Sequence, residues 1–346
     1  MSRPSGGKWA CVFGASLLMT GCAGPARSER VNQIGMCVQM IGADSQTIER
    51  EFDLLSAMNV GLIRTDFDWS AVEGERGRFD WSYPDRMVQE ARDRKIDILP
   101  VLAWTPGWAR SPGSTTHEPP ARIEDFADFA RAAAKRYAPL GVRRWEIWNE
   151  PNSSKFWEPL PNPDRYGELF RAAASAIRSV DPGAEILTAG LTRGTSTPDG
   201  KRISQQAFLT ALYRNGSAQL ASAIAIHPYT FPALPWAADP VKPGGLADLP
   251  AVHGLMEAWG DGHKKIWITE YGAPTGTAPE AMTEAAQLAS IVQAREMVHS
   301  WDWAGPLIYF ELRDSGTSKS DIEQNFGVFH ADLSPKKAGS ALVGPA

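Results

Sequence analysis

Cysteine, clusters of basic residues and metal-binding motifs are scarce in this chain of 346 residues. Two of its three cysteines, Cys11 and Cys22, lie near the N-terminus, so Cys37 is the only thiol in the part expected to fold. We therefore expect no intramolecular disulfide. The sequence has no Lys/Arg run and a formal net charge of −5, which argues against a nucleic-acid partner. It has no HExxH motif, and its histidine spacing indicates no metal site, so we expect neither a metal nor a cofactor.

The N-terminus also lacks an apolar run long enough to cross a bilayer. Arg3 and Lys8 precede an apolar stretch at residues 9–19, which is shorter than the ~18–20 residues needed to cross a bilayer. The sequence LLMTGC at residues 17–22, where this stretch ends, resembles a bacterial lipoprotein signal, in which the cysteine is lipidated. On that interpretation residues 1–21 are the signal peptide, Cys22 carries the lipid anchor and residues 22–30 are a tether. The protein would then be exported and held at a membrane of the cell envelope. The alternative is an ordinary secretory signal in which Cys22 has no role.

From residue 31 onward, short apolar runs alternate with amphipathic stretches. The expected strands are residues 34–39, 60–67, 96–104, 143–150, 184–190, 221–229, 264–272 and 305–312. The clearest expected helices are residues 45–58, 123–137, 163–180, 203–214, 246–259 and 282–299. Continuous apolar strands separated by helices are typical of a parallel sheet covered by helices. Eight such units predict an α/β fold, a single-domain (β/α)8 TIM barrel over residues 31–340. An open doubly wound sheet is the alternative, but the first strand lacks its Gly-rich phosphate turn.

Two of these strands end in a glutamate, in the sequences EIWNEP and WITEYGAP. Glu150 and Glu270 are 120 residues apart, on the fourth and seventh expected strands. Catalytic groups of such barrels lie at the C-terminal ends of the strands, where these two strands face each other across the mouth. Two carboxyl groups facing each other over a cleft are typical of glycoside hydrolysis. Pro151 follows Glu150, and the residue before a proline favours extended geometry, so we expect Glu150 in a strand-like conformation.

Four motifs in this order resemble one enzyme clan. They are IRTDFDW from residue 63, WEIWNEPN from residue 145, HPYTF from residue 227 and WITEYG from residue 267. The chain resembles a retaining (β/α)8-barrel glycoside hydrolase of the large clan A, most of all its family 39 and family 5 members. The resemblance implies double displacement and the absence of a cofactor. It makes a β-linked polysaccharide or oligosaccharide the expected substrate.

The resemblance also assigns roles to individual residues. Glu150 matches the acid/base of the clan, Glu270 its nucleophile, and Asn149 the residue that binds the sugar 2-hydroxyl. Arg64 matches an arginine that keeps the nucleophile ionised, although a purely structural ion pair is the alternative. His227 and Tyr229 match positions that orient the nucleophile or line the floor of the site, and a core histidine remains the alternative for His227.

Aromatic rings stack on sugar faces, so the tryptophans of strand-end loops are candidate binding residues. Trp104 and Trp108 follow the third expected strand and Trp157 follows the fourth, while packing in the core is the alternative for each. Glu311, in the last strand, is a candidate for binding sugar hydroxyls. A regular fourth strand would also place Glu146 inside the barrel, where it needs a partner such as an arginine, unless a bulge near Trp148 changes the alternation.

The sequence therefore predicts a monomeric retaining glycosidase that acts inside an envelope or extracellular polysaccharide. Two alternatives stay open. One is a carbohydrate-binding envelope lipoprotein without activity on the same barrel, against which the retention of both glutamates argues. The other is a transglycosylase, which would share every catalytic residue.

Overall fold

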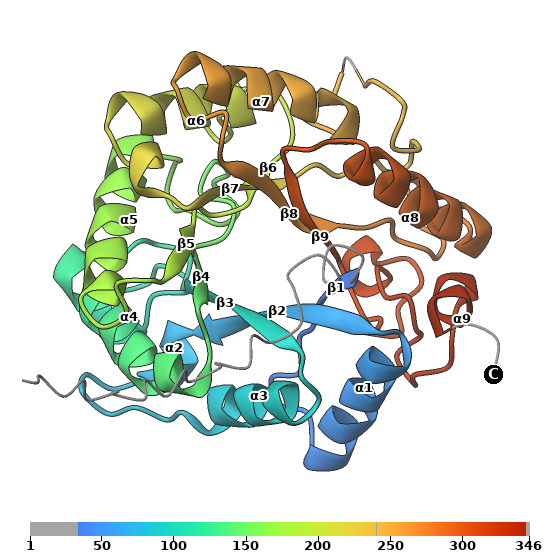
Figure 1. Cartoon of the computed structure of the whole chain (residues 1–346), viewed down its shortest axis with the longest axis horizontal. Coiled ribbons are helices and arrows are strands. Elements are labelled where there is room, and N and C mark those ends of the chain that lie inside the picture. The colour runs from blue at the N-terminus through green and yellow to red at the C-terminus, as the bar shows by residue number, and fades with distance from the viewer. Residues whose placement is uncertain (1–33, 240, 344–346) are drawn as a thin grey trace, which may run out of the picture. The chain divides into compact units, whose positions relative to one another are not determined.

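The computed structural model describes residues 34–239 and 241–343, and this part of the chain forms a closed parallel barrel (Figure 1). Nine strands pair in the order β5-β4-β3-β2-β1-β9-β8-β7-β6, and a pairing between β5 and β7 closes the sheet. The strands are β1 (Ile34–Cys37), β2 (Val60–Asp68), β3 (Asp97–Ala103), β4 (Arg144–Ile147), β5 (Glu185–Leu187), β6 (Leu191–Thr192), β7 (Ala223–His227), β8 (Lys265–Tyr271) and β9 (Ala304–Tyr309). The predicted (β/α)8 fold is confirmed.

Helices surround the barrel and follow its strands in turn (Figure 1). They are α1 (Ser45–Ala57), α2 (Trp69–Val72), α3 (Ser82–Asp93), α4 (Ile123–Tyr137), α5 (Pro163–Arg178), α6 (Gln205–Arg214), α7 (Leu249–Ala258), α8 (Glu284–His299) and α9 (Lys337–Val343). Several begin at the side-chain caps that the sequence offers. The Asn162 side chain accepts from the backbone at the start of α5, and Thr283 does so for α8. Among the described residues, no helix has the length and apolar character that a bilayer crossing requires.

β5 and β6 together occupy the fifth position of the barrel, and the break between them is filled by side-chain contacts. Ala225 N–H donates to the Thr188 hydroxyl at 3.0 Å, and Ala189 N–H donates to the Tyr166 hydroxyl at 2.7 Å. Gly190 N–H donates to a carboxylate oxygen of Glu146 at 2.9 Å. At the break the Ala189 and Gly190 amides therefore donate to side chains, those of Tyr166 in α5 and Glu146 in β4, instead of to a neighbouring strand.

Two apolar layers hold the barrel. Residues between strands and helices form the large core, and a smaller cluster fills the barrel interior. Leu62, Leu99, Leu187, Trp267 and Ile308 belong to the interior cluster. Burying each such side chain contributes about 1.5–3 kcal/mol, so this layer forms a firm floor for the polar residues nearer the mouth. The predicted signal peptide (1–21), the tether (22–30) and Cys22 lie outside the described residues.

Candidate active site

Glu150 and Glu270 lie together at the C-terminal ends of the strands. Glu150 is three residues beyond the end of β4, and Glu270 lies in β8, the seventh position of the barrel. One oxygen of each carboxylate and one ring nitrogen of His227 are all within 4.8 Å of one another. Retaining glycosidases hold their carboxyl groups about 5–5.5 Å apart, whereas inverting ones need about 6.5–9.5 Å. The separation therefore suits the retaining arrangement.

The backbone after β4 is irregular, and the expected extended geometry of Glu150 is wrong. Glu150 has a φ of 43° and Trp148 a φ of 73°, both in the left-handed region that side chains rarely adopt. The Trp148 ring packs against Trp157 and Phe126 of α4, outside the barrel. Glu146 instead points inside. The alternation thus changes at Trp148, which lets Glu146 and Glu150 both serve the site.

Glu146 is completely buried in the barrel, and its charge is fully satisfied. Arg64 Nε donates to one of its oxygens at 2.8 Å, and Arg64 Nη2 donates to the other at 3.2 Å. Gly190 N–H and the Thr269 hydroxyl donate at 2.9 and 3.2 Å. Glu146 is not among the site residues that the sequence predicts, although the alternation in RRWEIWNE indicates that it needs an arginine partner. The ion pair fixes the guanidinium beside the catalytic face.

The same guanidinium reaches Glu270 and Asn149. Arg64 Nη1 donates to Glu270 Oε1 at 2.7 Å, and Nη2 donates to Asn149 Oδ1 at 2.9 Å. Tyr229 donates its hydroxyl proton to Glu270 Oε2 at 2.7 Å. Burial alone would raise the pKa of Glu270, but His227, Arg64 and the Tyr229 hydroxyl outweigh it and lower the pKa below its ordinary value. Glu270 is therefore held ionised, as a nucleophile must be.

His227 lies in a chain of hydrogen bonds that runs from Glu146 through Thr269 to Glu150. The Thr269 hydroxyl donates to Glu146, so its oxygen is left to accept from His227 Nε2 at 3.0 Å. The other ring nitrogen, Nδ1, lies 2.9 Å from Glu150 Oε1 and 3.4 Å from Glu270 Oε2, so the ring faces both carboxyl groups. A side chain at position 190 is impossible here, because a Cβ on Gly190 would lie 1.9 Å from His227 Nε2.

The predicted aromatic residues occupy three different environments. Trp104 is half-buried and donates its indole N–H to Asp66 at 2.8 Å. Trp108 donates to the Glu73 carbonyl at 2.7 Å, and the Arg76 guanidinium lies 4.2 Å from its ring centroid. Trp157 is only 1% exposed and packs in the core, so it offers no face to a sugar. The sequence could not separate these cases, because each tryptophan follows a strand in the same way.

Glu311 lies toward the helix layer rather than in an open cleft. Its side chain is 3% exposed, and it lines a cavity of about 10 Å³ with Gln39, Glu51 and Arg313. That space is the size of a single water molecule and does not admit a sugar ring. The position therefore does not favour the predicted binding of sugar hydroxyls. Burial, followed by repulsion from Asp314 and Glu270, raises the pKa of Glu311 to about 8.

We expect Glu311→Gln to stabilise the protein at alkaline pH. The folded state holds the Glu311 proton up to a pKa of about 8, whereas the unfolded chain releases it near the ordinary value of 4.5. The unfolded state therefore binds fewer protons between these values, and the wild type loses stability as pH rises through this window. The cost is on the order of a few kcal/mol above pH 8 and vanishes below about pH 4.5. Urea unfolding at about pH 5 and pH 9 measures it, with the exposed Glu296→Gln as control. Equal pH dependence in both variants would contradict the expectation.

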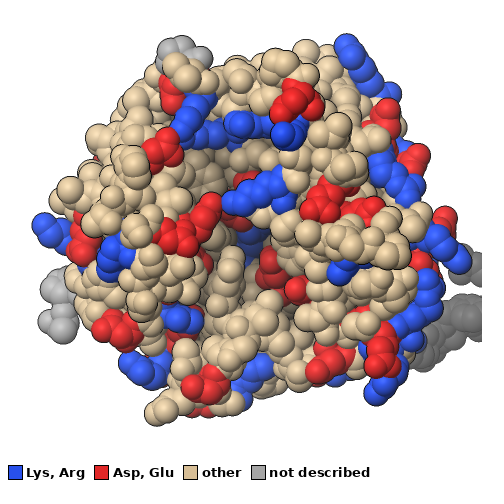
Figure 2. Space-filling view, turned by 180° about the vertical axis from the view of Figure 1, so that it is seen from behind, with Lys and Arg blue, Asp and Glu red and all other residues tan. Residues whose placement is uncertain are grey.

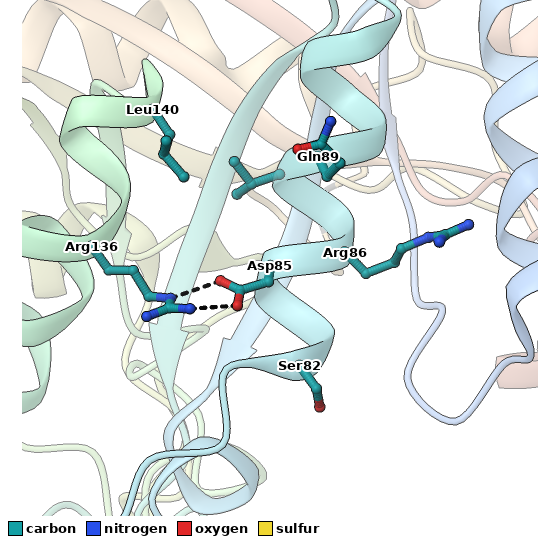
Figure 3. Close-up of a pocket in the computed structure, with 7 residues that line it drawn as sticks. Ser82, Asp85, Arg86, Gln89, Arg136 and Leu140 are labelled. Carbon is teal, nitrogen blue, oxygen red and sulfur yellow. Dashed lines mark hydrogen bonds and ion pairs between the residues drawn. The ribbon is translucent and has the colours of Figure 1, made fainter.

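The surface has hollows of two kinds. Figure 2 shows a face that is hollowed at its centre, with acidic and basic side chains in and around the hollow. A separate groove lies on the outside of the barrel between α3 and α4 (Figure 3). There Asp85 pairs with Arg136 in a bidentate ion pair, so the strongest charges of the groove neutralise each other. The outer groove contains neither Glu150 nor Glu270 and carries no part of the proposed chemistry.

Glu150, His227 and Glu270 also form a possible metal-ligand set. Arg64 places a cation 2.7 Å from Glu270, and a second cation at the same carboxylate would be repelled. The hydrogen-bond chain moreover uses both ring nitrogens of His227. The arrangement favours acid/base and nucleophilic chemistry over metal binding.

Comparisons with known proteins find a similar curated protein and similar solved structures among glycosidases. A curated relative, a β-xylosidase from Geobacillus stearothermophilus, is 29% identical over 128 residues, which cover 33% of this chain and 25% of the relative. A family 39 glycoside hydrolase structure from Bacteroides cellulosilyticus WH2 has a TM-score of 0.72 at 21% identity, covering 90% of this chain and 62% of that one. An exo-β-1,4-mannosidase from Opitutaceae bacterium strain TAV5 has a TM-score of 0.61 at 20% identity, covering 90% and 58%. At these identities the two structures show the fold alone.

The family comparison covers most of the barrel. The model of the cellulase family, glycosyl hydrolase family 5, matches residues 25–305, which include the ends of β2, β4, β7 and β8 where the site lies. The chain therefore belongs to the cellulase family, glycosyl hydrolase family 5.

Proposed function

We propose that the protein is a retaining glycosidase that cleaves β-linked polysaccharides by double displacement. The observation that carries this proposal is the pairing of Glu270, ion-paired with Arg64, and Glu150, hydrogen-bonded to His227, with one oxygen of each within 4.8 Å. The family supports glycoside hydrolysis, and the carboxyl separation supports retention. The β-xylosidase relative from Geobacillus stearothermophilus, which acts on a β-linkage, supports this linkage here.

In the first step Glu270 attacks the anomeric carbon while Glu150 gives its proton to the departing glycosidic oxygen. The products are an ester between the sugar and Glu270, a free hydroxyl on the leaving glycan and a Glu150 carboxylate. Arg64 and Tyr229 contact the two Glu270 oxygens and orient the attack. Asn149 Oδ1 is occupied by Arg64, which leaves its amide N–H groups to donate to a sugar hydroxyl.

In the second step Glu150 takes a proton from water as the water oxygen attacks the anomeric carbon. The ester bond breaks, Glu270 regains its charge and Glu150 regains its proton. The loss of the Glu270 charge in the ester favours this change of role, because it removes the negative charge next to Glu150.

Covalent labelling tests the proposal. Mechanism-based 2-fluoroglycosides of several sugars should form a stable ester, detected by intact mass, and peptide mapping should place it on Glu270. The label should be absent from Glu270→Gln and present in the exposed control Glu296→Gln. No labelling by any sugar, together with glycan binding by Glu150→Gln and Glu270→Gln equal to wild type, would favour the carbohydrate-binding alternative.

We also propose, from the sequence alone, that the protein is exported and anchored through a lipid on Cys22. The support is the sequence LLMTGC after a short apolar run. Fractionation of cells that express the wild type or Cys22→Ala tests this. If Cys22 carries the lipid, the wild type is in the membrane fraction and Cys22→Ala is not.

A further inference from the structure

Asp66 points into the mouth of the barrel, although the steps above do not use it. It lies two residues beyond Arg64 in β2, so the two side chains share the inner face of the strand. Phe67, between Asp66 and the next inward position, points outward and meets Tyr137 of α4 at a ring distance of 5.2 Å. Asp66 therefore lies one layer nearer the open end than Arg64, on the catalytic face.

One oxygen of Asp66 is bound and the other is available. Trp104 Nε1 donates to Oδ2 at 2.8 Å, and no hydrogen bond from residues 34–239 or 241–343 reaches Oδ1. Asp66 is partly exposed, so Oδ1 has access to solvent. Trp104 itself has a φ of 72°, a conformation that costs a tryptophan energy and is found where the surrounding structure imposes it. The chain thus holds an indole ring and a carboxylate oxygen side by side at the mouth.

The charge around Asp66 is negative. The Arg64 guanidinium already pairs with two carboxylates, those of Glu146 and Glu270. Burial raises the pKa of Asp66 to about 6, despite the opposing effects of Arg64 and the Trp104 N–H, so the group is ionised at neutral pH. Asp66 would therefore repel a carboxylate or sulfate on a bound sugar, and the Arg64 guanidinium beside it is already engaged by two carboxylates.

We propose that Asp66 and Trp104 form one wall of the sugar subsite and select an uncharged sugar residue. Trp104 offers a ring edge and face to the sugar, and Asp66 Oδ1 accepts from its hydroxyls. Repulsion from Asp66 rejects a uronic acid or a sulfated sugar at the same place, so selection works by repulsion as well as attraction. This inference rests on the proposed function, because it assigns a substrate class to the same cleft.

Binding of uncleavable sugars tests the wall without requiring turnover. The probes are 4-nitrophenyl β-thioglycosides of xylose, glucose, galactose and mannose, with those of glucuronic and galacturonic acid, titrated by calorimetry. We expect at least one neutral probe to bind, and its acidic counterpart to bind about 10-fold more weakly or worse. Asp66→Asn should weaken the neutral probe about 10-fold, because a hydrogen bond to a charged acceptor is lost, and should tighten the acidic one.

Two further variants keep the test decisive. Trp104→Phe keeps a ring but removes the N–H that orients Asp66, so it should weaken the neutral probe less than Asp66→Asn does. Asp85→Asn removes a carboxylate from the outer groove of Figure 3 and should bind every probe as wild type does. The proposal is overturned if no probe binds, or if Asp66→Asn leaves the ratio of neutral to acidic affinity unchanged. If covalent labelling fails but sugar binding still depends on Asp66, the hydrolase proposal is rejected and the subsite proposal is kept.

Discussion

Glu270→Gln is expected to lower kcat by about 10⁴-fold or more, the largest loss that we predict for a single substitution. The amide cannot attack the anomeric carbon, and no other carboxylate of the described residues is bound by both Arg64 and Tyr229. The loss should be equally large with a reactive 2,4-dinitrophenyl glycoside, because a better leaving group does not replace the nucleophile. Steady-state kinetics on both a polymer and this aryl glycoside measure it.

Glu150→Gln provides the matched comparison, because it removes the proton donor and keeps the nucleophile. Its kcat should fall about 10²–10⁴-fold on a polymer. The rate of the first step should fall less on a 2,4-dinitrophenyl glycoside, because 2,4-dinitrophenolate leaves without a proton. Azide should rescue the two alanine variants with opposite stereochemistry. It should attack the ester of Glu150→Ala and give the retained glycosyl azide, and it should replace the nucleophile of Glu270→Ala and give the inverted one. The same stereochemistry from both variants would reject the assignment of roles.

The sequence predicts the barrel and the two glutamates well, because both depend on local signals. The alternation of apolar strands and amphipathic helices needs only the chain's own periodicity. Glu150 and Glu270 follow from their positions at strand ends and from the motifs around them. Closure of the barrel then brings them to the same mouth, so no long-range packing detail has to be known.

The remaining features depend on packing that no local pattern contains. Trp104 and Trp157 both follow strands, yet Trp104 is half-buried beside Asp66 and Trp157 lies in the core. The left-handed conformation of Glu150 is imposed by its surroundings against the preference that Pro151 creates. Asp66 sits within an ordinary strand sequence, and only the inward direction of β2 and the contact with Trp104 give it a place in the cleft.

Arg64→Met is the second substitution with a large expected effect, and it acts on both stability and catalysis. It leaves the buried Glu146 with only Gly190 N–H and the Thr269 hydroxyl as partners. Breaking a buried ion pair from one side typically costs about 3–5 kcal/mol. It also removes a cation that lowers the pKa of Glu270, so that pKa should rise. Because Glu270 must be ionised to attack, the acidic limb of the pH profile of kcat/KM should move to higher pH.

The double variant Arg64→Met/Glu146→Leu separates the two effects. Replacing a buried ion pair by apolar side chains of similar volume is often neutral, and can be stabilising by about 1–4 kcal/mol, so urea unfolding should show stability largely recovered. Activity should stay low and its acidic limb should stay displaced, because Glu270 still lacks its guanidinium. If the double variant regained activity along with stability, Arg64 would be a structural ion pair and no more. The geometry argues otherwise, because one guanidinium binds Glu146 through Nε and Nη2, Asn149 through Nη2 and Glu270 through Nη1. The buried ion pair with Glu146 is therefore what holds the cation that Glu270 needs.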